Sequence, residues 1–230
     1  MFEEGQKNNT NKSGLIYAIV GVAVLIVAVA GSAYAYYSAT AADTSTVKGT
    51  AGGGAAPILV VAKASATGPR GEMLIPIDAT SLDTAAKATS KCVDKNGYTV
   101  CQIYKVTITH QTNVKTSYDI SLSIPKVSTM PSICAAKMSN ENTVTTISNT
   151  DKNPVLIGTD VIKNAASGVI TPRDISGSIC SPKDMTNKST VTCYFMVYIK
   201  NDTSAQKDSG AFTGTVTAVG SNGAEVKAQF

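Results

Sequence analysis

A long uncharged segment near the start of the chain constrains its fold more than any other feature. No charged residue occurs in Ser13–Ala42, and within it Leu15–Tyr37 reads LIYAIVGVAVLIVAVAGSAYAYY. A helix needs about 20 apolar residues to cross the hydrocarbon of a bilayer. Tyrosines stand near both ends, where amphipathic rings favour the headgroup boundary. We therefore predict a transmembrane helix or signal-anchor at 14–37, whose partner is the lipid bilayer through Leu15–Tyr37.

A cleaved signal peptide is the alternative. Ala33-Tyr34-Ala35 offers an A-x-A site just past the apolar stretch, so cleavage after Ala35 stays open. The apolar core, Leu15–Ala30, is longer than a usual signal, and Glu3 and Glu4 offset nearby lysines. The prediction therefore keeps residues 1–13 as a short cytoplasmic tail, with the C-terminal domain outside the cell membrane. Cleavage would instead make that domain a secreted, cell-surface protein.

The next segment, 38–57, is rich in small residues. It reads SATAADTSTVKGTAGGGAAP and contains the triplet Gly52–Gly54. Glycine loses the most freedom on ordering, so this composition is typical of a flexible linker. A glycine loop that holds phosphate would need a Lys-Ser/Thr ending, which the segment lacks.

Beyond the linker the hydrophobic pattern has a period of two, as in a half-buried strand. Tyr118, Ile120, Leu122 and Ile124 alternate with polar residues, and Val100–His110 repeats the pattern. Further strands are expected at Thr190–Lys200, which is apolar on both faces and therefore central, at Ala211–Val219 and at Ala224–Phe230. Weaker patterns at Asp83–Ala88 and Asp160–Ala166 allow short helices.

Composition supports the same fold class. Ser and Thr are abundant beside Val and Ile, and β-branched side chains pack well on a pleated surface. Short strands at spacings of roughly 8–12 residues are typical of a sandwich. We predict an all-β sandwich, Ig-like or jelly-roll, over residues 58–230, outside the membrane and preceded by the single N-terminal transmembrane helix.

The first two of five cysteines bracket a predicted hairpin. Between Cys92 and Cys101 lies VDKNGYTV, and Asn96-Gly97 at its centre favours a two-residue type I′ turn. Counting outward from that turn sets Cys92 opposite Cys101 as a non-hydrogen-bonded pair, with Cα atoms about 4.5 Å apart. That separation suits a disulfide. We expect this disulfide, and with it an oxidising compartment.

The pairing of the other cysteines stays open. Cys180 and Cys193 flank a polar loop and could close a second disulfide, while Cys134 could instead pair with either of them. A zinc site would need a second close pair of thiolates or imidazoles, and no such spacing occurs. We therefore expect no metal site.

Few residues suggest catalysis. His110 is the only histidine, it ends a strand, and we expect it in a solvated loop. Ser204-Ala205-Gln206-Lys207 matches S-x-x-K without its companion motifs. Asp94–Gly97 is half of a calcium loop without the closing Glu, and the hairpin explains it. We predict no catalytic residues, no small-molecule cofactor and no enzymatic activity.

Charge excludes one further class. The net charge is +4 and the basic residues are scattered, whereas a nucleic-acid groove needs a clustered stripe. We expect no nucleic-acid partner.

Two stretches resemble a known family. Cys193–Val219, CYFMVYIKNDTSAQKDSGAFTGTVTAV, is similar to the end of small bacterial surface proteins of the TasA/camelysin biofilm-fibre type. The segment CVDKNGYTVCQIYKVTITH resembles a strand pair in related exported proteins of low-GC Gram-positive bacteria. Together they cover about a fifth of the chain. The resemblance implies a β-sandwich or jelly-roll domain at the cell surface that assembles into matrix fibres. Camelysins are described as proteases, but a metal-ligand set is missing from this sequence.

These observations favour one function over two others. The leading hypothesis is a membrane-anchored structural surface protein, a fibre or matrix subunit that self-associates through strand edges. The first alternative is a tethered adhesin or ligand-binding module with recognition loops such as Lys200–Gly210. An anchored hydrolase is the remote alternative.

Overall fold

The computed structural model describes residues 44–48, 56–89, 91–127, 129–148, 150, 152–158, 162–163, 170–171, 173–201 and 210–230. All of them belong to residues 42–230, the second of the two units into which the chain divides. The predicted tail and the predicted transmembrane segment at 14–37 lie outside these residues. In the part that is described, no helix is long and apolar enough to cross a membrane.

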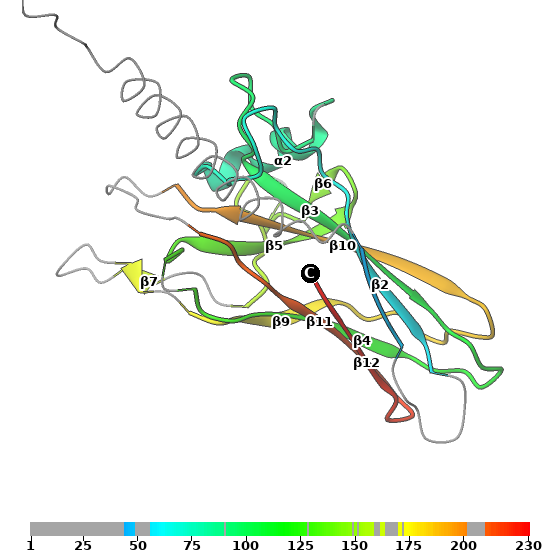
Figure 1. Cartoon of the computed structure of the whole chain (residues 1–230). Coiled ribbons are helices and arrows are strands. Elements are labelled where there is room, and N and C mark those ends of the chain that lie inside the picture. Colours follow the sequence, from blue (N-terminus) through cyan, green and yellow to red (C-terminus); the bar gives the residue numbers. More distant parts are fainter. Residues whose placement is uncertain are drawn as a thin grey trace, which may run out of the picture. The chain divides into compact units, whose positions relative to one another are not determined.

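Two antiparallel sheets pack face to face as a sandwich (Figure 1). The six-stranded sheet has the order β1 (Thr44–Lys48), β2 (Ile58–Lys63), β3 (Cys101–Thr109), β10 (Thr190–Ile199), β5 (Ile133–Asn140) and β6 (Thr143–Val144). The four-stranded sheet has the order β12 (Glu225–Gln229), β11 (Thr215–Gly220), β4 (Tyr118–Ile124) and β9 (Ile175–Cys180). A separate short pair consists of β7 (Ile162–Lys163) and β8 (Ile170–Thr171). The predicted sandwich is confirmed.

Strand β10 is central, as its apolar pattern predicts. It lies between β3 and β5, with Phe195 opposite Tyr104 on one side and Lys137 on the other. Phe195 and Val197 point into the space between the sheets, whereas Met196 and Tyr198 point away from it. A strand that is apolar on both faces needs cover on both, and this sheet provides it.

The main core fills the space between the two sheets, and aromatic rings connect them. The ring of Phe230, which follows β12, lies 4.4 Å from the ring of Tyr104 and 5.3 Å from that of Phe195, centre to centre. Gly214 allows this approach, because a Cβ there would come within 2.4 Å of the Phe230 ring. The alternating face of β4 packs in the same core, as predicted.

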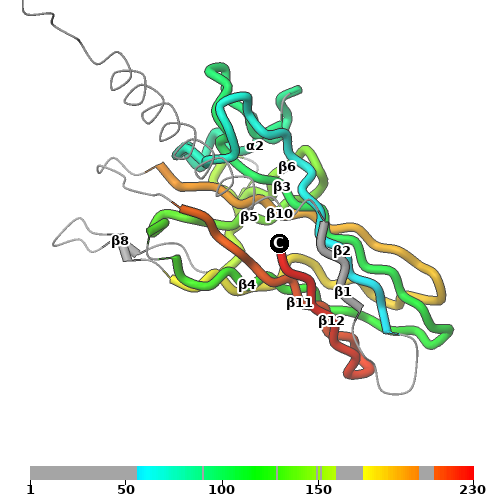
Figure 2. The backbone as a smooth tube through the Cα atoms, in the orientation of Figure 1, coloured from blue at the N-terminus to red at the C-terminus, as the bar shows by residue number. Residues whose placement is uncertain are grey.

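A second core covers the outer face of the six-stranded sheet. The chain between β2 and β3 leaves the sheet and forms the short helices η1 (Ala79–Ser81) and α2 (Leu82–Lys87) above it (Figures 1 and 2). Leu82 and Ala86 of α2 are fully buried against outward-facing residues of the central strands. The helix allowed at Asp83–Ala88 is therefore present, one residue earlier. In the second helical pattern, Asp160–Ala166, the two residues that are described form β7 instead.

The predicted linker contains a strand. Thr44–Lys48, within 38–57, pairs with β2 in antiparallel register, with Thr46 opposite Val60. These five residues of the predicted flexible linker form a strand. Their sequence, TSTVK, is rich in β-branched residues, and the edge of β2 supplies the backbone partners that composition alone does not reveal.

Candidate functional site

The disulfide between Cys92 and Cys101 is present, but the hairpin around it has a different turn. The N–H of Gly97 donates to the carbonyl oxygen of Asp94 at 3.0 Å, and the N–H of Asp94 donates to that of Tyr98 at 2.9 Å. The loop therefore has three residues, and the predicted two-residue turn is wrong. Gly97 has a φ of 83°, as expected after a type I turn in such a loop.

A side chain selects this turn. The Asp94 carboxylate oxygen Oδ1 accepts the N–H groups of Asn96 at 2.9 Å and Tyr98 at 2.8 Å. Asp favours turns through such bonds to its own backbone. The carboxylate thus stabilises the turn. This role explains the Asp94–Gly97 pattern, which resembles half of a calcium loop, without a bound cation.

The longer loop shifts the register by one residue. Val93 lies opposite Thr99, and the N–H of Val100 donates to the carbonyl oxygen of Cys92 at 2.8 Å. Cys92 therefore does not lie opposite Cys101. It reaches Cys101 because its own backbone is left-handed, with a φ of 64°, and the Cα atoms are 4.8 Å apart.

A second disulfide joins Cys180, the last residue of β9, to Cys193 in β10. Since β9 and β10 belong to different sheets, this bond connects the two layers of the sandwich. Cys134 of β5 keeps its thiol and is buried in the second core. The pairing left open by the spacing is therefore Cys180 with Cys193.

The loop closed by this second disulfide is fixed to the loop between β3 and β4. The backbone groups of Thr116 and Met185 exchange hydrogen bonds of 3.0 and 2.9 Å. The N–H of His110 donates to the carbonyl oxygen of Ser189 at 2.9 Å, and the N–H of Lys188 donates to that of His110. The two loops behave as one hydrogen-bonded unit at this end of the sandwich.

His110 lies inside that unit, with 1% of its surface exposed, so the prediction of a solvated loop histidine is wrong. Its Nε2 is 2.8 Å from the carbonyl oxygen of Val114, which can only accept, so Nε2 carries the proton. Nδ1, 2.8 Å from the Tyr118 hydroxyl, then accepts from that hydroxyl. Burial raises the pKa of the Tyr118 phenol. This histidine has a structural role, because its ring joins the loop to Tyr118 of β4.

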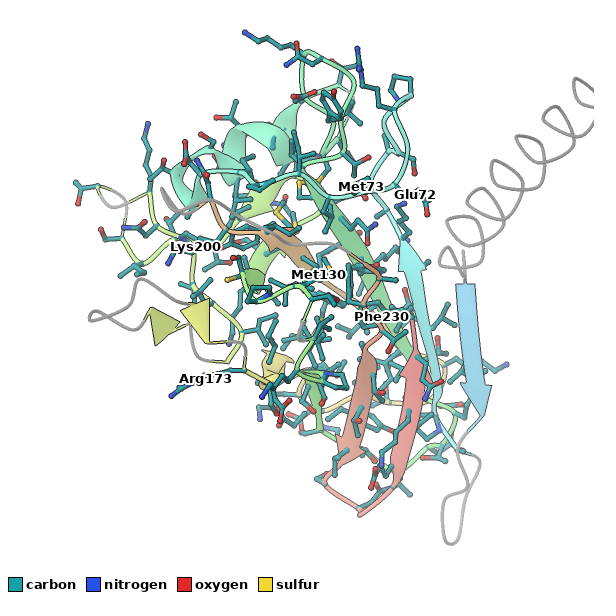
Figure 3. The ribbon with its side chains drawn as sticks, turned by 60° about the vertical axis from the view of Figure 1, so that its left-hand side comes forward. Glu72, Met73, Met130, Arg173, Lys200 and Phe230 are labelled. Carbon is teal, nitrogen blue, oxygen red and sulfur yellow. A yellow bond between two sulfur atoms is a disulfide. The ribbon has the colours of Figure 1, made fainter. Side chains whose placement is uncertain are left out.

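One open pocket lies beside the second core. It has a volume of about 530 Å³. Its mostly apolar lining consists of Ala79, Ile147, Asn153, Pro154, Val155, Leu156, Gly158, Tyr198 and Lys200. Lys200, which follows β10, brings a positive charge to it, and this residue is labelled in Figure 3. A small ligand with an apolar body would match this lining.

The remaining predicted features do not come together in one place. Ser204, Ala205, Gln206 and Lys207 lie outside the residues that are described, as does most of the Lys200–Gly210 loop. Across the described ranges, no group of three or more His, Cys, Asp or Glu side chains is arranged to hold a metal ion.

Sequence reasoning missed two features of this region. The hydrogen bond between His110 and Tyr118 had only a weak signal in the sequence. Tyr118 begins the apolar face of a strand, and it lies only eight residues after His110. The pocket had no signal in the sequence, because residues 153–158 carry no periodic pattern and reach β5 through single bridges such as Ala136 with Leu156.

No family model and no curated protein matches this chain.

Proposed function

We propose that this chain is a membrane-anchored extracellular protein with a structural role at the cell surface. It acts as a fibre or matrix subunit whose domain associates with copies of itself through strand edges. In this proposal the sandwich is of Ig-like or jelly-roll type, and the helix at 14–37 anchors it to the membrane.

The two disulfides support the location. Cys92–Cys101 and Cys180–Cys193 fix a hairpin and the two sheets. Such bonds persist in oxidising compartments and are rare in a reducing cytoplasm. A domain with two of them is best explained by export, in agreement with the apolar segment Leu15–Tyr37.

The single observation that carries the role is the edge strand β1. The other edges are protected: β6 has two residues and an irregular register, and β12 presents Glu225 and Lys227. The backbone of Gly158 approaches β9 so closely that a Cβ on Gly177 would lie 2.8 Å from its nitrogen. Strand β1 has five residues, one of them charged; among the described strands its backbone pairs only with β2, and β12 of the other sheet lies close to it. Such an edge is a template for another strand.

Two proline variants test this proposal on residues 42–230. Successive N–H groups of a strand point to opposite sides, so Ser45→Pro and Thr46→Pro each remove a donor from a different side of β1. The donor that faces β2 stabilises the fold, and its loss should lower the melting temperature. Loss of the other should reduce association, measured by light scattering over a series of concentrations, with the melting temperature unchanged.

The two variants are each other's control. A fragment that is monomeric at every concentration would contradict the proposal. So would association that neither proline changes.

A second candidate function, a tethered ligand-binding module, is favoured by the pocket near Lys200. Leu156→Trp would fill that space, whereas Val219→Trp would add the same ring at a site remote from it. An array of small acids, peptides and glycans should give a hit that Leu156→Trp abolishes and Val219→Trp keeps. An array without a specific hit would end this candidate.

A further inference from the structure

The outer face of the four-stranded sheet carries a regular set of hydroxyl groups. Three adjacent strands each contribute two, with one buried or small residue between them; we call the six residues the hydroxyl array. Its members are Ser176 and Ser178 of β9, Ser121 and Ser123 of β4, and Thr215 and Thr217 of β11.

Strand register aligns these side chains in two rows. Ser123 lies opposite both Ser176 and Thr215, and Ser121 lies opposite both Ser178 and Thr217. Residues directly opposite share a face, and the intervening Leu122 is buried in the core. Neighbours are therefore about 4.8 Å apart across the strands and about 7 Å apart along them.

Most of these hydroxyls have no partner within the described part of the chain. Ser178 donates to Asp119 at 3.0 Å, and Ser121 donates to the carbonyl oxygen of Thr217 at 3.5 Å. The side-chain hydroxyls of the other four make no hydrogen bond to a described residue. By contrast, Thr109 and Thr190, which are opposite each other in the other sheet, bond to each other at 3.1 Å. One complete row, across all three strands, thus makes no side-chain hydrogen bond within the described ranges.

The chemistry of the hydroxyl array selects the partner. A hydroxyl is neutral and both donates and accepts, so its best complement is a surface of other hydroxyls. Ser and Thr side chains have little rotamer freedom to lose on binding, and the sheet holds them in place. Lys227 and Gln229 of β12 continue the rows with longer polar groups, opposite Thr217 and Thr215. We propose that this face binds a neutral polysaccharide chain lying across the strands.

This inference goes beyond self-association, which uses strand edges and leaves this face open. It also places recognition away from the pocket near Lys200.

Paired threonine substitutions test the proposal on the full chain with its disulfides intact. Thr215→Val with Thr217→Val removes two hydroxyls and keeps side-chain shape and strand preference. The matched control is Thr107→Val with Thr192→Val, a pair of opposite residues on the outer face of the other sheet. Retention on cellulose and chitin is measured by sedimentation, and folding by melting temperature.

We expect at least one polysaccharide to retain the wild-type chain and the array variant to be retained about tenfold less, as the loss of two hydrogen bonds implies. The control variant should bind as the wild type does. Ser123→Ala with Ser176→Ala should repeat the loss on the other strands.

No retention on any polysaccharide, or equal losses in array and control variants, would overturn the proposal. So would a change in self-association without polysaccharide, which would make the face an interface between copies. Edge-mediated association is scored separately, so either proposal can fail alone.

Discussion

The imidazole of His110 holds together the loops at one end of the sandwich. It accepts from the Tyr118 hydroxyl and donates to the Val114 carbonyl oxygen. His110→Ala should lower the free energy of unfolding by about 2–4 kcal/mol, because it leaves the buried phenol without its acceptor and creates a cavity. Urea denaturation measures the change. Asn113→Ala, in the exposed part of the same loop, should change it by about 0.5 kcal/mol at most. Equal effects of the two variants would refute the role of the ring.

Tyr104 makes stability depend on alkaline pH. Burial, and secondarily the charge of Glu72, raise the pKa of its phenol, whose hydroxyl donates to Gln102 at 2.7 Å. The unfolded chain, with a tyrosine pKa of about 10, loses this proton first. The stabilisation is therefore complete below about pH 10 and is lost as pH rises through the higher pKa of the folded state. Tyr104→Phe should reduce the slope of unfolding free energy against pH above 10, by up to about 1.4 kcal/mol per pH unit. Identical slopes would show that the phenol stays unperturbed. Tyr118, whose pKa burial also raises, should contribute to the remaining slope.

At the scale of elements, the hairpin of the first disulfide stores backbone strain at Cys92. A φ of 64° is costly for any residue with a Cβ and free for glycine. Removal of the disulfide as Cys92→Ala with Cys101→Ala should lower stability by about 3 kcal/mol. Cys92→Gly with Cys101→Ala should lose about 1 kcal/mol less, in the same denaturation experiment. If the glycine variant were the less stable of the two, the left-handed conformation would be contradicted.

Elements differ in how much of them the sequence determines. Strands β4 and β10 were predictable because burial on one face or on both is written in the alternation of their own residues. The turn before Tyr98 was not predictable in this way, because Asn96-Gly97 is compatible with two types of turn. The carboxylate of Asp94, two residues earlier, stabilises one of them. The burial of His110 depends on a loop some 75 residues later in the chain, and the pairing of β1 depends on the edge of β2. Contacts of this kind have no local signal.

At the scale of the whole molecule, the two disulfides stabilise the segments that form the two hydrophobic cores. Cys92–Cys101 fixes the segment that covers the outer face of the six-stranded sheet, and Cys180–Cys193 joins the two sheets. Cys134 lies in the second core, on the β5 side of Tyr198, while Cys101 lies on its β3 side. Two strand spacings separate these cysteines, about 10 Å, which is too far for a disulfide. The fold therefore excludes a disulfide between Cys101 and Cys134.

The thiol count of the exported chain should reflect this arrangement. Native protein should react slowly with a thiol reagent, because Cys134 is only 4% exposed. Unfolding without reductant should release one thiol per chain, and reduction should raise the number to five. Chain retained in a reducing compartment should give five thiols without reductant, and its melting temperature should be lower, because both cross-links are missing. Intact mass of the same sample reports whether the chain is cut after Ala35. Three thiols in the unfolded, unreduced, exported chain would show that one disulfide does not form, and none would show that Cys134 pairs between chains.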